Sequence, residues 1–118
     1  MTDITLYHNP RCSKSRAALA LLEENEVKPK LVLYLDNAPT IEELQELLRK
    51  LGIGLNDLLR RGEPEYDELG LGDESLSESI KLDLVSKHPQ LLQRPIAIKG
   101  DRAIIGRPPE NVLQLLED

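Results

Sequence analysis

The chain has very little cysteine and few aromatic residues. Its 118 residues include one cysteine, Cys12, and three tyrosines, but no phenylalanine or tryptophan. A single cysteine cannot form an internal disulfide, so redox chemistry at this thiol must take its second thiol from another molecule. The scarcity of aromatic residues predicts a core built mainly from leucine, isoleucine, valine and alanine.

Charge and hydropathy exclude several partners. The formal net charge is −6, so the chain as a whole would repel nucleic acids and anionic membrane surfaces. No apolar run approaches the ~20 residues of a membrane-spanning helix, and Asp3 stands where the apolar region of a secretory signal peptide would begin. His8, His88 and Cys12 lack the spacing of zinc ligands. We expect a cytoplasmic monomer with a reduced thiol, no tightly bound cofactor or metal, and no nucleic-acid or membrane partner.

Hydrophobic periodicity predicts a single α/β domain over residues 1–118. Residues 3–8 alternate as a strand does, and residues 13–25 have the period of a helix. Residues 31–35 form an unbroken apolar run, as expected of a strand covered on both faces. The first 35 residues therefore predict a right-handed, parallel β-α-β unit. The buried face of its helix is expected to carry Ala17, Ala18, Leu21 and Leu22.

The middle of the chain, about residues 40–90, is predicted to be a helical insertion. Thr40 and Glu43 have the spacing of a capping box at the start of a helix. Two further helices are expected at residues 55–60 and 77–88, the second closed by the proline that follows it. The inward face of that second helix is expected to carry Ile80, Leu84 and Val85.

After the insertion, the hydrophobic period changes to two. Residues 95–106 predict a hairpin that turns at Gly100-Asp101, and a last helix follows from Pro108-Pro109. Pairing of the two strands makes Arg94 and Arg107 neighbours at the open end of the hairpin. Two guanidinium groups at one place fit an anion with several oxygens. The alternative is that both arginines are surface residues paired with acidic side chains.

The stretch around Cys12 carries the candidate chemistry. Cys12 opens the first helix among basic residues, and both features favour a thiolate; the alternative is a buried, unreactive cysteine. Ser15 stands where a Cys-x-x-Cys motif has its second cysteine, so its hydroxyl can donate to Cys12 or to its own helix backbone. His8 can orient the thiolate, carry a proton or only fix a loop, and we favour the orienting role.

Several blocks together resemble the glutaredoxin-coupled arsenate reductase (ArsC-like) family. They are Tyr7-His8-Asn9-Pro10 followed by Cys12-x-x-Ser15-Arg16, then Leu58-Leu59-Arg60-Arg61, Arg94-Pro95-Ile96 and Arg107-Pro108. The blocks follow in the family's order across the chain. The resemblance implies a thioredoxin-like fold with a mixed sheet and a helical insertion. Ser13 and Lys14, in place of small residues, are typical of the chromosomal, YfgD-like branch.

The resemblance also implies roles for individual residues. Cys12 would be the nucleophile, and polar contacts from His8 and Ser15 would lower its pKa. Pro95 would follow a cis peptide bond. Three arginines would bind the oxygens of arsenate or a similar oxyanion: Arg60, Arg94 and Arg107. The implied activity is reduction of arsenate to arsenite, with glutathione as co-substrate and glutaredoxin as the protein that supplies the resolving thiol.

Two other functions stay open at this point. The Cys-x-x-Ser motif also fits a glutathione-linked thiol oxidoreductase that acts on another substrate. A related branch of the same fold consists of non-enzymatic regulators that bind RNA polymerase. Those regulators lack the full arginine set, and this chain has it in Arg60, Arg94 and Arg107.

Overall fold

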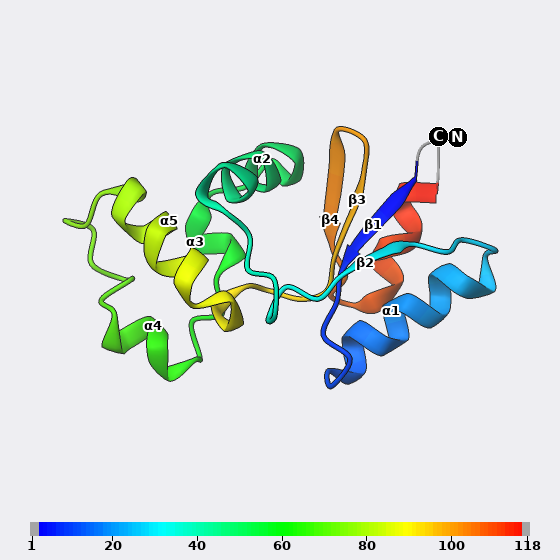
Figure 1. Cartoon of the computed structure of the whole chain (residues 1–118), viewed down its shortest axis with the longest axis horizontal. Helices are drawn as coiled ribbons and strands as arrows, with labels where there is room; N and C mark the ends of the chain where they lie inside the picture. Colours follow the sequence, from blue (N-terminus) through cyan, green and yellow to red (C-terminus); the bar gives the residue numbers. More distant parts are fainter. Residues whose placement is uncertain (1–2, 117–118) are drawn as a thin grey trace. The chain divides into compact units, whose positions relative to one another are not determined.

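The computed structural model describes residues 3–116, which fold into two compact units (Figure 1). The first unit contains the described residues up to Asn37 and those from Arg94 onward. The second unit is the segment Ala38–Gln93. The second unit thus corresponds to the helical insertion predicted at about residues 40–90.

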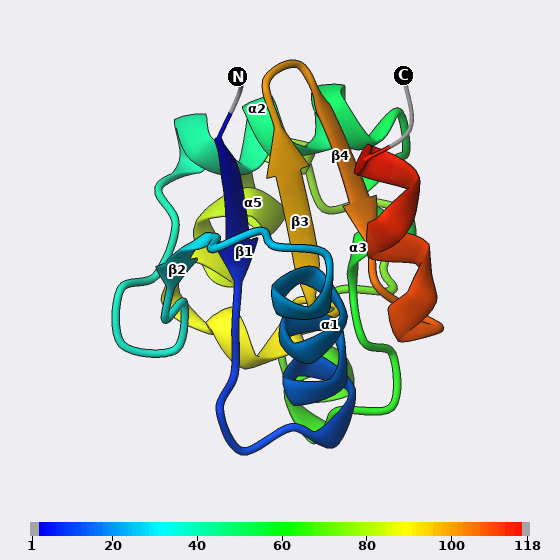
Figure 2. The same ribbon diagram turned by 90° about the vertical axis from the view of Figure 1, so that its right-hand side faces the viewer.

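The first unit is built on a mixed sheet with the strand order β2-β1-β3-β4 (Figure 2). β1 runs parallel to β2 and antiparallel to β3, and β3 pairs antiparallel with β4. The order of strands along the chain is the predicted β-α-β unit followed by a hairpin. The strand bounds are Ile4–Tyr7 for β1, Lys30–Val32 for β2, Ile96–Lys99 for β3 and Arg102–Ile105 for β4.

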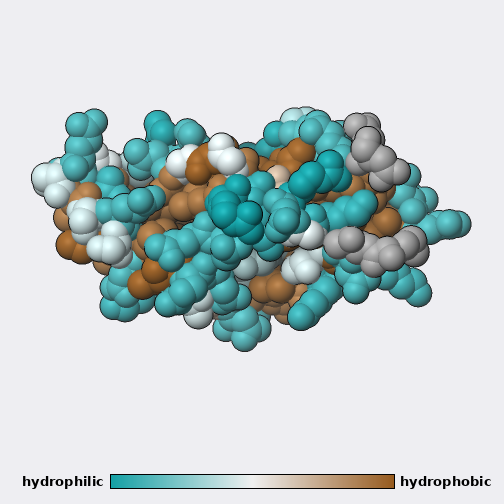
Figure 3. Space-filling model, turned by 90° about the horizontal axis from the view of Figure 1, so that it is seen from above, coloured by the Kyte–Doolittle hydropathy of each residue, from teal (hydrophilic) through white to brown (hydrophobic). Residues whose placement is uncertain are grey.

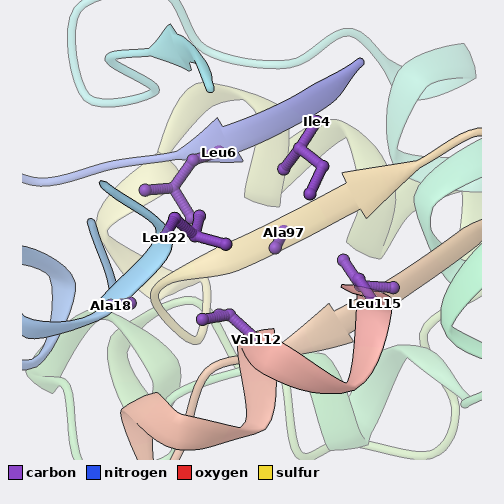
Figure 4. Close-up of a cluster of buried hydrophobic side chains, with 7 residues drawn as sticks. All are labelled: Ile4, Leu6, Ala18, Leu22, Ala97, Val112 and Leu115. Atoms are coloured by element: carbon purple, nitrogen blue, oxygen red, sulfur yellow. The ribbon is translucent and has the colours of Figure 1, made fainter. Parts of the chain in front are cut away.

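Two helices cover one face of this sheet. α1 (Ser13–Glu24) packs against η2 (Pro109–Leu116), and η2 also contacts β3 and β4 (Figure 2). η2 was predicted as an ordinary helix and is a 3₁₀ helix. Aliphatic side chains from the strands and both helices meet between these layers (Figure 4). They are Ile4, Leu6, Ala18, Leu22, Ala97, Val112 and Leu115.

The buried face of α1 includes a polar residue that the sequence pattern did not place there. Its fully buried side chains are Ser15, Ala18 and Leu22, which follow one another at helical spacing. Ala17 was predicted on this face and is exposed, because Ser15 rather than Ala17 occupies the position that begins the stripe. Leu21 lies at the edge of the stripe and is half-buried.

The prediction that residues 31–35 form a strand covered on both faces is wrong. β2 ends at Val32 and lies at the edge of the sheet. The chain then turns, with the Asp36 N–H donating to the Leu33 carbonyl at 2.9 Å. Tyr34 is buried and its ring stacks on that of Tyr7, with 6.3 Å between centroids. The leucines of the run are 36–44% exposed: Leu31, Leu33 and Leu35.

The second unit is helical. Its elements are α2 (Ile41–Leu51), α3 (Leu55–Leu58), α4 (Pro64–Glu68), α5 (Glu78–Lys87) and the 3₁₀ turn η1 (Pro89–Leu91). The predicted capping box is confirmed, since the Glu43 N–H donates to Thr40 Oγ1 at 3.1 Å and the Thr40 N–H donates to Glu43 Oε1 at 3.0 Å. Gly52 ends α2 with a φ of 69°, which glycine adopts without steric cost.

One inward residue of α5 was predicted wrongly. Leu82 and Val85 are buried, Leu84 is half-buried, and Ile80 is 50% exposed. Ile80 precedes Leu82 by two residues, which is about 200° around a helix. Once Leu82 and Val85 set the buried stripe, Ile80 must face the other way.

The face drawn in Figure 3 is mainly hydrophilic, with apolar patches between the hydrophilic side chains. Within residues 3–116, no helix is both long enough and apolar enough to cross a membrane. The same residues contain no group of three or more His, Cys, Asp or Glu side chains placed to hold a metal ion.

We predict that Gly106→Ala destabilises the protein. Gly106 is buried, and a Cβ there would lie 2.8 Å from Pro95 Cγ and 3.0 Å from Val112 Cγ1. Overpacking of this kind typically costs about 1–3 kcal/mol. The free energy of unfolding, measured in urea, should therefore fall.

Gly62→Ala is the control, because no atom lies within 4 Å of the Cβ it adds and its φ lies outside the left-handed region. It should change stability by less than about 1 kcal/mol. Equal unfolding free energies for the two variants would show that Pro95 and Val112 move aside at no cost.

Candidate active site

Cys12 occupies the N-cap position of α1. Its φ of −94° and ψ of 123° are the extended values typical of an N-cap. Its carbonyl accepts the Arg16 N–H at 3.0 Å, which starts the helix. The first N–H groups of a helix have no partner in the preceding turn, and an N-cap side chain faces them. Here that side chain is a half-buried thiol.

The surroundings of this thiol favour its ionised form. Burial raises the pKa of Cys12, but the N–H groups of Ser15 and Lys14 and the guanidinium of Arg94 together bring that pKa below its ordinary value. Ser15 and Lys14 belong to the first turn of α1, where the helix dipole also favours negative charge. Cys12 thus has the environment of a reactive cysteine rather than of an inert buried one.

Ser15 acts on Cys12 through its backbone. Its side chain is fully buried, and Oγ lies 2.6 Å from Nδ1 of the buried His8 ring and accepts the Asn9 N–H at 3.0 Å. Burial, together with the charge of Arg16, lowers the pKa of His8 below its usual value, so the ring is neutral at pH 7. His8 and Ser15 form a pair beside Cys12, and their predicted effect on its pKa stays a prediction.

Two residues that the sequence analysis did not assign to the site shape the loop before Cys12. Asn9 accepts the Arg11 N–H on Oδ1 and the Cys12 N–H on its carbonyl, both at 3.0 Å. The guanidinium of Arg16 donates to the Pro10 carbonyl at 2.9 Å. The signal for Asn9 was its place before a proline, where asparagine often forms a turn with its own side chain.

The open end of the hairpin places Arg94 beside the thiol. The β3–β4 register pairs Ile96 with Ile105 and continues outward through the Gly106 N–H, which donates to the Pro95 carbonyl at 2.8 Å. The backbones of Arg94 and Arg107 therefore flank the same end of the hairpin, as predicted. The Arg94–Pro95 peptide bond is cis, which confirms that expectation.

Arg94 and Arg107 differ in their environment. Nε and Nη1 of Arg94 are buried, and neither has a hydrogen-bond partner among residues 3–116. Buried donors of this kind normally have a partner, and a guanidinium offers them in the planar arrangement that oxyanions match. Arg107 is exposed, and its carbonyl accepts a bond from the Asn111 side chain at 3.1 Å.

Arg60, the third predicted anion ligand, belongs to the second unit. It follows α3, and its N–H donates to the Leu91 carbonyl at 2.7 Å. Its guanidinium is paired with the Glu63 carboxylate at 2.5 Å, and both side chains are about one quarter exposed. Its role as an anion ligand stays a prediction.

Comparison with known proteins decides the family. The family model described as the ArsC family matches residues 7–115, which includes every candidate site residue. The chain belongs to the ArsC family. Among relatives of this ArsC-family chain, the Escherichia coli K12 protein YfgD, described as uncharacterized, is 46% identical over 97% of each chain. An arsenate reductase of Neisseria meningitidis (strain Z2491) is 43% identical over 98% of this chain and all of its own.

The solved structures agree with this assignment. A structure described as an arsenate reductase from Vibrio cholerae has a TM-score of 0.93 and 42% identity, covering 96% of this chain and 97% of its own. Structures of such ArsC-family members have the thioredoxin-like fold, which confirms the predicted fold class.

We predict that Cys12 is alkylated by iodoacetamide at a lower pH than an ordinary cysteine. Only the thiolate reacts, so the rate follows its titration, and the midpoint should lie below the ~8.5 of a free cysteine. Because the chain has one thiol, the rate reports Cys12 alone. Arg94→Gln should raise the midpoint, since it removes a nearby positive charge and a hydrogen-bond donor.

Arg102→Gln is the matched control. It removes the same charge from the same hairpin, but Arg102 pairs with Lys99 at the opposite end of the β3–β4 ladder. Its midpoint should stay with that of the parent protein. If both variants gave the parent midpoint, Arg94 would not stabilise the Cys12 thiolate.

Proposed function

We propose that this protein reduces arsenate to arsenite, with the Cys12 thiolate as nucleophile and with glutathione and glutaredoxin as the external thiols. The observation that supports this most directly is Arg94, whose buried, unpartnered N–H donors adjoin a thiol at a helix N-terminus. A nucleophile beside unoccupied oxyanion donors is the arrangement needed for attack on an oxyanion. The names of the relatives in Neisseria meningitidis and Vibrio cholerae agree with arsenate as substrate.

The proposed reaction begins with attack of the Cys12 sulfur on arsenic(V). An arsenic–oxygen bond breaks, that oxygen leaves as water, and Arg94 and Arg107 neutralise negative charge on the remaining oxygens. Hydrogen bonds to charged groups contribute about 1.5–3 kcal/mol each. Arg60 is the third proposed ligand, and it must exchange its bond to Glu63 for one to the anion.

External thiols supply the electrons. Glutathione attacks next and displaces a second oxygen as water, which gives an arsenic species held by Cys12 and glutathione. The thiol of glutaredoxin then attacks the glutathione sulfur; a mixed disulfide forms, the arsenic–glutathione bond breaks and its electron pair reduces arsenic(V) to arsenic(III). Water then breaks the bond between Cys12 and arsenic(III) and releases arsenite. Over the whole cycle, two thiols are oxidised to one disulfide, arsenic gains two electrons, one oxygen leaves as water and arsenite is released. Cys12 returns to its starting state. No internal thiol can replace glutaredoxin, because Cys12 is the chain's single cysteine.

The lowered pKa of Cys12 gives the expected pH dependence. A thiol whose pKa is depressed is ionised above that pKa, so the first step should be fastest above the pKa of Cys12 and should slow as the pH falls through it.

The decisive experiment is NADPH consumption in an assay that couples this protein to glutathione, glutaredoxin and glutathione reductase, with and without arsenate. We expect arsenate-dependent consumption that Cys12→Ser abolishes, because the hydroxyl of serine is not ionised at neutral pH. Arsenate-dependent turnover that survives Cys12→Ser would contradict the mechanism.

Two other outcomes point to the alternative functions. Glutathionylation of Cys12 without an arsenate effect would indicate a thiol oxidoreductase of another substrate. Absence of both, together with binding to RNA polymerase that tolerates Cys12→Ser, would indicate a non-enzymatic regulator.

Replacement of the arginines tests the oxyanion site separately. Arg94→Gln and Arg107→Gln should each raise the KM for arsenate about tenfold or more, the equivalent of losing a charge-assisted hydrogen bond. Arg102→Gln, at the far end of the same hairpin, should change KM by less than about fivefold, as expected of an exposed charge. Equal effects of the three substitutions would mean that only the net charge of the protein matters.

A further inference from the structure

We propose that Asn9 is a positioning residue for Cys12: its hydrogen bonds fix the loop of residues 9–12 so that the thiol occupies the N-cap of α1. The proposal deepens the proposed function, since it concerns the same nucleophile. It rests on contacts made by three separate groups of one residue, the main-chain N–H, the main-chain carbonyl and the side-chain Oδ1.

The side chain of Asn9 forms a turn over Pro10. Oδ1 accepts the N–H of Arg11, two residues on, at 3.0 Å, which is the geometry of an Asx turn. Pro10 sits at the centre of this turn, and its ring restricts its own φ. The turn therefore brings the chain back toward the helix immediately before Cys12.

The main chain of Asn9 connects the turn to Cys12 and to Ser15. Its carbonyl accepts the Cys12 N–H at 3.0 Å, and its N–H donates to Ser15 Oγ at 3.0 Å. Ser15 is fully buried in α1 and also contacts the His8 ring. Asn9 thus joins the residue that carries the sulfur to the turn of helix whose N–H groups face that sulfur.

The position of the sulfur depends on this connection because Cys12 has no cap bond of its own. An N-cap serine or aspartate is held in place by the bond that its side chain accepts from the helix. Here the main chain before the cap must provide that restraint. Loss of the Asn9 turn should let Cys12 leave the extended N-cap conformation and move its sulfur away from the Lys14 and Ser15 N–H groups.

The test is the pH profile of iodoacetamide alkylation in Asn9 variants of the full chain. Asn9→Ala removes the acceptor for the Arg11 N–H, and Asn9→Gln keeps the amide but places it one methylene too far away. Both should move the midpoint up by about half a pH unit or more, which slows alkylation about threefold at a pH below both midpoints. Asn9→Ser, whose hydroxyl can accept the same N–H, should retain most of the parent profile.

Asn25→Ala is the matched control. The Asn25 side chain also fixes a turn of α1, donating to the Leu21 carbonyl at 2.8 Å, but at the C-terminal end of the helix. This variant should leave the midpoint unchanged whatever its effect on stability. If Asn9→Ala does not fold, the comparison of Asn9→Gln with Asn9→Ser carries the test alone.

The proposal is overturned if folded Asn9→Ala or Asn9→Gln titrates like the parent protein, because Asn9 would then contribute to stability only. Failure of the proposed function looks different, since the alkylation assay contains no arsenate. If the Asn9 variants raise the alkylation midpoint but the protein never reduces arsenate, the role of Asn9 stands and arsenate is not the substrate. If arsenate is reduced, Asn9→Ala should lower kcat at a pH below the midpoint of the variant. The kcat should recover at higher pH, and the KM for arsenate should stay nearly unchanged.

Discussion

The site depends on one constraint, the placement of a thiol where a helix normally has a capping oxygen. A serine or aspartate at Cys12 would accept a helix N–H and stabilise α1. The cysteine lacks that cap bond, and the N–H groups of Lys14 and Ser15 instead favour negative charge on sulfur. Part of the capping stabilisation of α1 is thereby exchanged for a reactive thiolate. The buried pair of His8 and Ser15 and the turn at Asn9 lie around this position and hold the chain that carries it.

The second half of the site comes from the far end of the first unit's sequence. The β3–β4 hairpin needs its register, because a shift by one residue would turn each side chain to the opposite face. Ala97 pairs with Ile104 in the core layer, and the bond from the Gly106 N–H to the Pro95 carbonyl extends the pairing to the residue directly after Arg94. The hydrophobic core thus determines where the guanidinium of Arg94 lies relative to the thiol. At this end of the sheet, the residues that pack the hairpin also position the candidate site.

Local patterns predicted much of the fold. The capping box at Thr40, the extent of α1 and the turn of the hairpin depend on neighbours in the sequence, and all agree with the structure. The errors occurred where burial depends on distant residues. The apolar run at residues 31–35 has the composition of a central strand, but its place at the sheet edge follows from the strand order, which periodicity does not encode. The same holds for Ile80, whose exposure follows from which side of α5 is covered.

The candidate site shows the same division. Residue types and hairpin pairing predicted Cys12 at a helix start and the proximity of Arg94 to Arg107. The hydrogen bond between Ser15 and His8 was not predictable, because the partner of a buried hydroxyl depends on the rotamers of both side chains.

The arginines of the candidate site differ in the partners they already have. An anion that binds Arg94 supplies a partner to donors that have none among the described residues, whereas an anion that binds Arg60 must displace the carboxylate of Glu63. A buried donor depends on a hydrogen-bond partner more than an exposed one does, so an anion contributes more at Arg94 than at Arg60.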